Sequence, residues 1–129
     1  MDTASHSLWQ RIDRFQIDRP DATLTFTARL ARDNGWSRDY ARRVVDEYKR
    51  FMFLTTVADH VVTPSEAVDQ AWHLHLTYTR SYWGEFCGEV LGRKVHHDPT
   101  TGQIILARRL FSLGRGGRDR DRGLSRYTE

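Results

Sequence analysis

The chain has 129 residues, with 20 Lys and Arg against 17 Asp and Glu, a formal net charge of +3 and a pI near 9.3. This length suits one domain, which buries roughly two thirds of the surface that the unfolded chain would expose. No apolar run approaches the roughly 20 residues that span a bilayer, and no signal peptide is recognisable. The single cysteine, Cys87, excludes an internal disulfide, a cysteine-based zinc finger and a redox Cys-x-x-Cys motif. These absences predict a cytoplasmic protein without a membrane partner.

The positive charge is concentrated at the C-terminal end. Residues 108–129 contain seven arginines and three acidic residues, which leaves 13 basic and 14 acidic residues in 1–107. From residue 112 the composition becomes rich in Arg, Gly, Asp and Ser with few apolar residues, which is typical of a segment that cannot offset its ordering entropy. We therefore expect a helical domain over 1–111 and a poorly ordered Arg/Gly-rich tail over 112–129.

The first half of the chain shows the 3.6-residue apolar spacing of amphipathic helices. Apolar residues predict a first helix through 8–15 and a second over about 25–33, which stops at Asn34-Gly35 because glycine accepts the left-handed conformation. Ser37 is the expected N-cap of the third helix, whose stripe over 40–58 is the longest in the chain. We interpret this third helix as the centre of the core.

A fourth helix is predicted from a capping box. Thr63 supplies an N-cap hydroxyl, Pro64 occupies the first helical position and Glu66 the third. This helix should run to Leu76 or Thr77, followed by a break with a new cap within 77–79.

A fifth helix is predicted over 82–91, ending at Gly92. Residues 93–99 should be extended, because the proline at 99 disfavours helix in the residue before it. A last turn or two of helix is expected at 104–111. The resulting fold class is all-α, a single compact domain of about five helices.

Histidines cluster around the fourth and fifth helices. Asp69 and His73 are one turn apart on the same helix face, so an oxygen and an imidazole nitrogen can meet at one point. His75 lies about 160° around the helix from His73 and is interpreted as a buried core histidine. His96 or His97 could supply a further ligand by folding back. This spacing predicts a mononuclear metal site, with Zn or Fe(II) suited to nitrogen and carboxylate ligands.

Other interpretations of the same residues stay open. The metal site would serve a hydrolytic or an oxidative reaction. Alternatively the histidines cap helices, and an aromatic patch meets a protein partner in a non-enzymatic module.

Cys87 is interpreted as a small buried hydrophobe rather than a nucleophile. A third function, weak RNA binding through the Arg/Gly tail, rests on one Arg-Gly-Gly, so we expect no nucleic-acid partner. The aromatic patch comprises Trp72, Tyr78, Tyr82 and Trp83.

A set of motif residues runs from the third predicted helix to the segment after the fifth: Glu47–Phe51, Thr63–Ser65, Val68-Asp69, Trp72–Leu76, Tyr82, Phe86-Cys87, Gly92, His96-His97 and Pro99. On these residues the chain resembles the glycine-rich domain-containing protein-like family, in particular short bacterial relatives of the plant glycine-rich domain proteins. The resemblance spans residues 7–102 and implies a helical domain of uncharacterised function. The tail after 112 departs from the family's pattern, as a genuine tail or as a truncated or frame-altered end. The motif positions that the resemblance implies are Asp69, Trp72, His73, His75, Cys87, His96 and His97.

Overall fold

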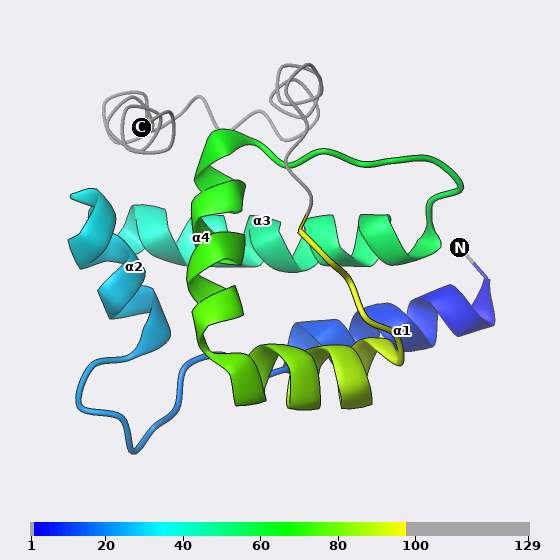
Figure 1. Cartoon of the computed structure of the whole chain (residues 1–129), viewed down its shortest axis with the longest axis horizontal. Coiled ribbons are helices and arrows are strands. Elements are labelled where there is room, and N and C mark those ends of the chain that lie inside the picture. The colour runs from blue at the N-terminus through cyan, green and yellow to red at the C-terminus, as the bar shows by residue number, and fades with distance from the viewer. Residues whose placement is uncertain (1, 98–129) are drawn as a thin grey trace.

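A computed structural model describes residues 2–97, and all the regular secondary structure within them is helical (Figure 1). This confirms the predicted all-α class for that part of the chain. The helix expected at 104–111 and the tail expected at 112–129 lie outside the described residues. The helices are α1 (Thr3–Arg14), α2 (Phe26–Asn34), α3 (Arg38–Val57), α4 (Glu66–Thr77) and η1 (Arg80–Leu91).

Helix α3 is the centre of the domain, as its long apolar stripe predicts. It packs against α1, α2 and α4, while η1 packs against α1 and α4. In Figure 1, α4 crosses α3 steeply, and the yellow-green η1 lies along α1. The buried apolar residues of these helices form one core cluster, which includes Ile12, Val44, Phe51 and Phe86. Within residues 2–97, no helix combines the length and apolar character needed to cross a bilayer.

The end of α2 at Gly35 and the start of α3 at Ser37 follow the predicted local signals, and α2 also begins at a side-chain cap, Thr25, that the sequence analysis did not predict. The Thr25 hydroxyl accepts a hydrogen bond from the backbone amide of Ala28, and the Ser37 hydroxyl accepts one from Tyr40. Each hydroxyl satisfies an amide that would otherwise lack an intrahelical partner. Gly35 ends α2 with a φ of 70°, in the left-handed region that glycine adopts without a steric penalty. The turn between the two helices is therefore encoded locally.

The start of α4 differs from the predicted capping box. The N-cap is Ser65, whose hydroxyl accepts a 3.2 Å hydrogen bond from the amide of Val68. Glu66 is consequently the first helical residue and not the third. Thr63 precedes a proline, which favours an extended conformation, and Ser65 offers a competing hydroxyl two residues later. The capping-box prediction at Thr63 was wrong by two residues.

The predicted break between the fourth and fifth helices is present, but its details differ. Tyr78 leaves the helical region with a ψ of 72°, whereas Thr79 has helical angles and makes no side-chain cap. The predicted new cap was therefore wrong. The following helix, η1, is a π-helix with backbone bonds between residues five apart. Its buried side chains show the matching wide spacing: Tyr82, Phe86, Cys87 and Leu91.

Candidate functional site

The site is built around Asp69, in the first turns of α4. Its side chain is 2% exposed, although aspartate is almost never buried without a partner. One carboxylate oxygen, Oδ1, lies 2.5 Å from Nε2 of His97. The other, Oδ2, is buried and accepts no hydrogen bond within the described chain. The positive end of the α4 dipole stabilises negative charge here, yet half of the carboxylate is left unpaired.

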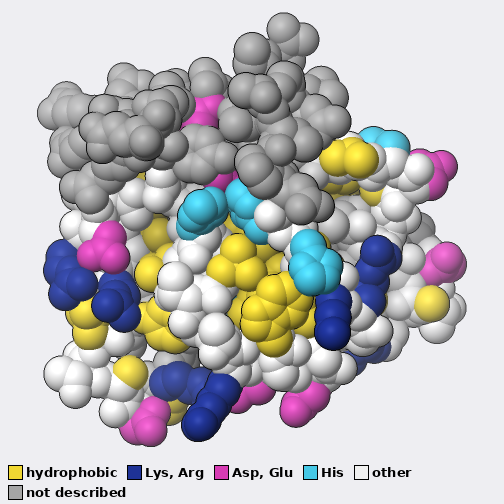
Figure 2. All heavy atoms as spheres, viewed as in Figure 1, with side chains coloured by type: hydrophobic (Ala, Val, Ile, Leu, Met, Phe, Trp, Pro, Cys, Tyr) yellow, Lys and Arg dark blue, Asp and Glu magenta, His cyan; other side chains and the backbone are white. Residues whose placement is uncertain are grey.

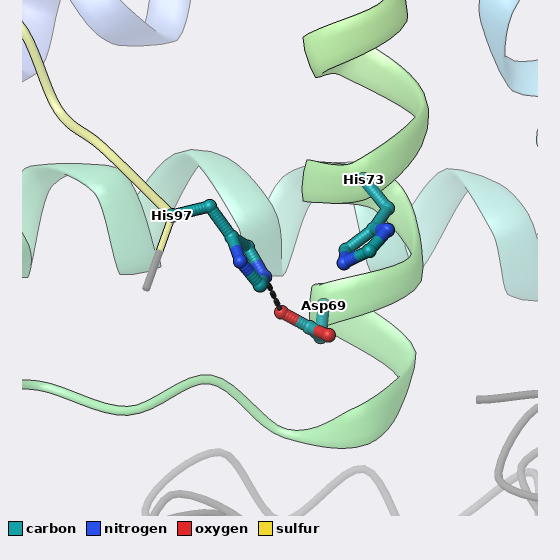
Figure 3. A group of neighbouring side chains, drawn as sticks. All are labelled: Asp69, His73 and His97. Carbon is teal, nitrogen blue, oxygen red and sulfur yellow. Dashed lines mark hydrogen bonds and ion pairs between the residues drawn. The ribbon is translucent and has the colours of Figure 1, made fainter. Parts of the chain in front are cut away.

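His73 lies one turn beyond Asp69 on the same face of α4, as the sequence predicts. Its side chain is exposed, and its ring centroid is 4.5 Å from that of His97, with the two rings nearly perpendicular. Figure 3 shows both rings beside the Asp69 carboxylate. One ligand atom from each of Asp69, His73 and His97 lies within 4.8 Å of the others. Two segments of the chain thus bring two imidazoles and a carboxylate together at the surface.

His97 reaches this cluster because the chain after η1 is fixed against α4. Val95 is buried, and its carbonyl accepts a hydrogen bond from the hydroxyl of Tyr82 at 2.5 Å. The same hydroxyl accepts a 2.9 Å hydrogen bond from Nε1 of Trp72. The indole of Trp72 also packs against the ring of His97, with centroids 4.5 Å apart. Neither the Tyr82 hydroxyl nor the Val95 carbonyl was anticipated from the sequence.

His96 is directed elsewhere. Its side chain is exposed, and its ring packs against Trp83 with centroids 5.2 Å apart. The sequence left the choice between His96 and His97 open, and the structure brings His97 into the cluster. Successive side chains of an extended segment point to opposite sides. Because Val95 is apolar and faces inward, His97 faces the same way, and this alternation was the available signal.

His75 is a core histidine, as predicted. It is fully buried, with Nδ1 2.7 Å from the hydroxyl of Tyr48 and Nε2 2.9 Å from Oγ of Ser81. A neutral imidazole donates from one nitrogen and accepts at the other, so both ring nitrogens are satisfied. Burial lowers the pKa of His75 from 6.5 to about 3. His75 therefore stays neutral at physiological pH and has no nitrogen left for a metal.

Cys87 is buried on η1 among core residues. Burial raises the pKa of its thiol, which disfavours the thiolate that acts as a nucleophile or metal ligand. The chemistry of Cys87 thus agrees with its interpretation as a small hydrophobe.

The predicted aromatic patch divides into buried and half-buried residues. Trp72 and Tyr82 are 6% and 0% exposed and pack within the core, where Trp72 contacts Phe51 at 5.0 Å between centroids. Tyr78 and Trp83 are half-buried. A protein partner binding at this patch would therefore contact mainly Tyr78 and Trp83, because Tyr82 is enclosed by the fold and only an edge of Trp72 is exposed.

Comparison with known proteins identifies the family. A model of the UCP032817-like family matches residues 13–107, about three quarters of the chain. The chain belongs to the UCP032817-like family. No curated protein matches it, and no solved structure matches it.

The resemblance to the glycine-rich domain-containing protein-like family was wrong, since the match is to the UCP032817-like family and nothing indicates a glycine-rich domain protein. Several residues that carried the resemblance have core roles: Trp72, His75, Tyr82 and Cys87 pack inside the domain. Packing requirements of this kind select similar residues in unrelated helical domains, so they identify a family poorly. The UCP032817-like family is uncharacterised, and the function must be argued from the site.

Proposed function

We propose that this domain is a metal-dependent enzyme in which Asp69, His73 and His97 hold one divalent metal ion. The observation that carries the proposal is the buried Oδ2 of Asp69, unpaired within residues 2–97, beside two imidazoles. Leaving a carboxylate buried and half paired is costly, because desolvation is not repaid by a hydrogen bond. A bound cation would satisfy the oxygen and neutralise the charge.

The spacing of the donor atoms is compatible with a shared ion after a small adjustment. Two donors each about 2.1 Å from a tetrahedral ion lie about 3.4 Å apart. The three donor atoms here lie within 4.8 Å of one another, so the rings must move by roughly an ångström. His73 is exposed, so most of this adjustment falls to its ring, whereas the ring of His97 is held between Trp72 and the Asp69 carboxylate. The fixed member of the set is the buried Asp69.

The donor set favours Zn or Fe(II). Two imidazoles and one carboxylate form the ligand set both of catalytic zinc sites and of non-haem iron sites. Three protein ligands leave coordination positions open, whereas structural zinc sites are usually closed by four. Such an ion supplies Lewis-acid activation of water, or redox chemistry when it is iron. The exposed His73 leaves the cluster accessible from solvent, so a hydrolytic or an oxidative reaction fits this geometry.

The test is metal content. The full chain is loaded with Zn(II), or anaerobically with Fe(II), freed of excess metal and measured by elemental analysis. We expect about one ion per chain, lost in Asp69→Asn and His73→Ala, since removal of a ligand leaves too few donors. His60→Ala removes an exposed histidine outside the cluster, and His96→Ala removes the neighbour of His97; both should keep the ion. Wild-type protein without metal, or His73→Ala with unchanged metal, would refute the proposal.

A further inference from the structure

A cavity of about 560 Å³ lies between the loop joining α3 to α4 and the chain that follows η1. Its volume is in the range of sites that bind small molecules. It is distinct from the three-residue cluster, yet the two share a wall, because Trp72 lines the cavity and also packs against His97. Figure 2 shows histidine side chains exposed beside hydrophobic ones on this face of the molecule.

The cavity has an apolar wall and a wall of nitrogen-bearing side chains. Its apolar side chains include one that is 68% exposed, Val61, so hydrophobic surface is available to a ligand. The nitrogen-bearing side chains are those of Arg93, His60 and His96. The remaining apolar residues are Ala58, Val62, Pro64, Trp72 and Val95.

Arg93 is the charged group best placed to recognise a ligand. Its Nη1 donates a 3.3 Å hydrogen bond to the carbonyl of Thr56, which directs the guanidinium along the cavity wall. Among the ion pairs of the described residues, none involves Arg93. The carboxylate that lines the cavity, Asp59, pairs with His60 at 3.1 Å. Arg93 thus keeps donors for a carboxylate, which the planar guanidinium binds in a bidentate manner.

We propose that this cavity binds a small molecule that carries one carboxylate on an apolar, preferably aromatic, body. The carboxylate would pair with Arg93, and the body would lie against Trp72 and the valines. Because Trp72 also contacts His97, the bound molecule would lie next to the Asp69, His73 and His97 cluster. That the molecule is the enzyme's substrate rests on the proposed metal centre, whereas its binding to the cavity does not.

The binding test uses two probes that share a phenyl body and differ in the head group, a charged carboxylate or its neutral amide. The ¹⁵N-labelled full chain, as purified and after chelator treatment, is titrated with phenylacetate and with its neutral analogue phenylacetamide, and amide shifts are followed by NMR. For ligands of this size we expect a dissociation constant on the order of 1 mM for phenylacetate. The amide should bind at least about tenfold more weakly, since it forms no charged pair. The shifts should centre on residues 59–64 and 93–96. Equal binding of the two probes, or no shifts at about 10 mM, would overturn the assignment.

Two pairs of variants locate the ligand. Arg93→Met should weaken phenylacetate binding at least about tenfold, whereas Lys94→Met makes the same charge change at an exposed neighbour that does not line the cavity and should leave binding unchanged. Val61→Asp places a negative charge at the exposed apolar wall and should abolish binding, while the uncharged Val61→Asn should retain more of it. Equal effects within either pair would contradict the proposed pose.

The experiments distinguish failure of the proposed metal centre from failure of the proposed ligand cavity. Phenylacetate binding that depends on Arg93, in a chain that takes up no metal, supports the cavity assignment and removes the proposed enzyme. Stoichiometric metal with no probe binding supports the metal centre and removes the cavity assignment.

Discussion

Two histidines on α4, His73 and His75, lie in regions that differ in how completely their buried polar atoms are hydrogen-bonded. His75 lies in the core, where Tyr48 and Ser81 occupy both ring nitrogens. His73 lies at the surface with Asp69, which is buried and has one carboxylate oxygen without a hydrogen bond in the described part of the chain. A histidine with both ring nitrogens bonded contributes to folding, whereas a buried carboxylate oxygen without a hydrogen bond beside imidazoles is the observation on which the proposed ion rests. Their positions around the helix predicted different roles for the two histidines, and the hydrogen bonds of His75 give the physical basis of the difference.

The largest expected effect is on stability, and it tests whether the two histidines differ as described. His75→Ala should lower the free energy of unfolding by about 3 to 5 kcal/mol, because it leaves a ring-sized cavity and two hydroxyls without their partner. His73→Ala in metal-free protein should change it by less than about 1 kcal/mol, since the side chain is exposed. Urea denaturation followed by circular dichroism measures both values. Similar losses of unfolding free energy in the two variants would contradict the assignment of His75 to the core and of His73 to the surface.

The pH dependence of stability sharpens the same contrast. Burial lowers the pKa of His75 to about 3 in the folded state, whereas the exposed side chain of the unfolded chain has a pKa of 6.5. Below pH 6.5 the unfolded chain binds a proton that the folded chain does not, so the free energy of unfolding falls as pH falls, by about 1.4 kcal/mol per pH unit. Between pH 6.5 and 5 this amounts to roughly 2 kcal/mol.

His75→Gln should remove most of that slope, whatever its effect on stability at neutral pH. His6→Gln is the control for the same substitution at an exposed position, on α1 and outside the core. Denaturation curves at pH 6.5, 6, 5.5 and 5 keep most carboxylates ionised. If the free energy of unfolding of His75→Gln depended on pH as steeply as that of the wild type, the proton taken up on unfolding would belong to another group.

Tyr82 is expected to position His97 without touching the metal. Tyr82→Phe removes the hydroxyl that joins Trp72 to the carbonyl of Val95. In the folded protein it should weaken metal binding about tenfold or more, as loss of an outer hydrogen bond to a ligand segment does. Competition with a chromophoric chelator measures the affinity. The control is Tyr78→Phe, which removes a hydroxyl bonded to Arg29 of α2; a matching loss there would point to general destabilisation.

The smallest expected effect concerns the residue where the His97 segment begins. Gly92 has a φ of 74°, so Gly92→Ala should cost about 1 kcal/mol of unfolding free energy through backbone strain alone, since its added Cβ meets open space. Gly84→Ala is the matched control: it also has room for a methyl group but lies within η1, where alanine should stabilise by roughly 0.5 to 1 kcal/mol. Thermal or urea unfolding distinguishes the opposite signs.

The sequence predicted most where local physics decides. Apolar spacing located the helices, and Ser37, Gly35 and Gly92 marked helix ends because caps and left-handed glycines depend on near neighbours. The prediction of where α4 begins was wrong because the sequence offers two N-cap hydroxyls, those of Thr63 and Ser65, and only Ser65 is used. The π-helical form of η1 was missed, since it depends on packing against α1 and α4 and leaves a weak periodic signal.

The candidate site was predictable in part. Asp69 and His73 follow from helical spacing, because one turn fixes their separation. The choice of His97 over His96 needs the inward direction of Val95, and the orphaned Oδ2 of Asp69 is visible only in three dimensions. The cavity beside Trp72 gathers residues from 55 to 96, which no local pattern brings together.

The pairing of Asp69 with His97 spans 28 residues of chain. An ion held by both would therefore act as a removable crosslink that closes α4, η1 and the following segment into a loop. Because the unfolded chain does not preserve the site, a free ion concentration a hundredfold above the dissociation constant would raise the free energy of unfolding by about 2.7 kcal/mol. In a domain without a disulfide in residues 2–97, the availability of metal would then set how often this half of the protein opens.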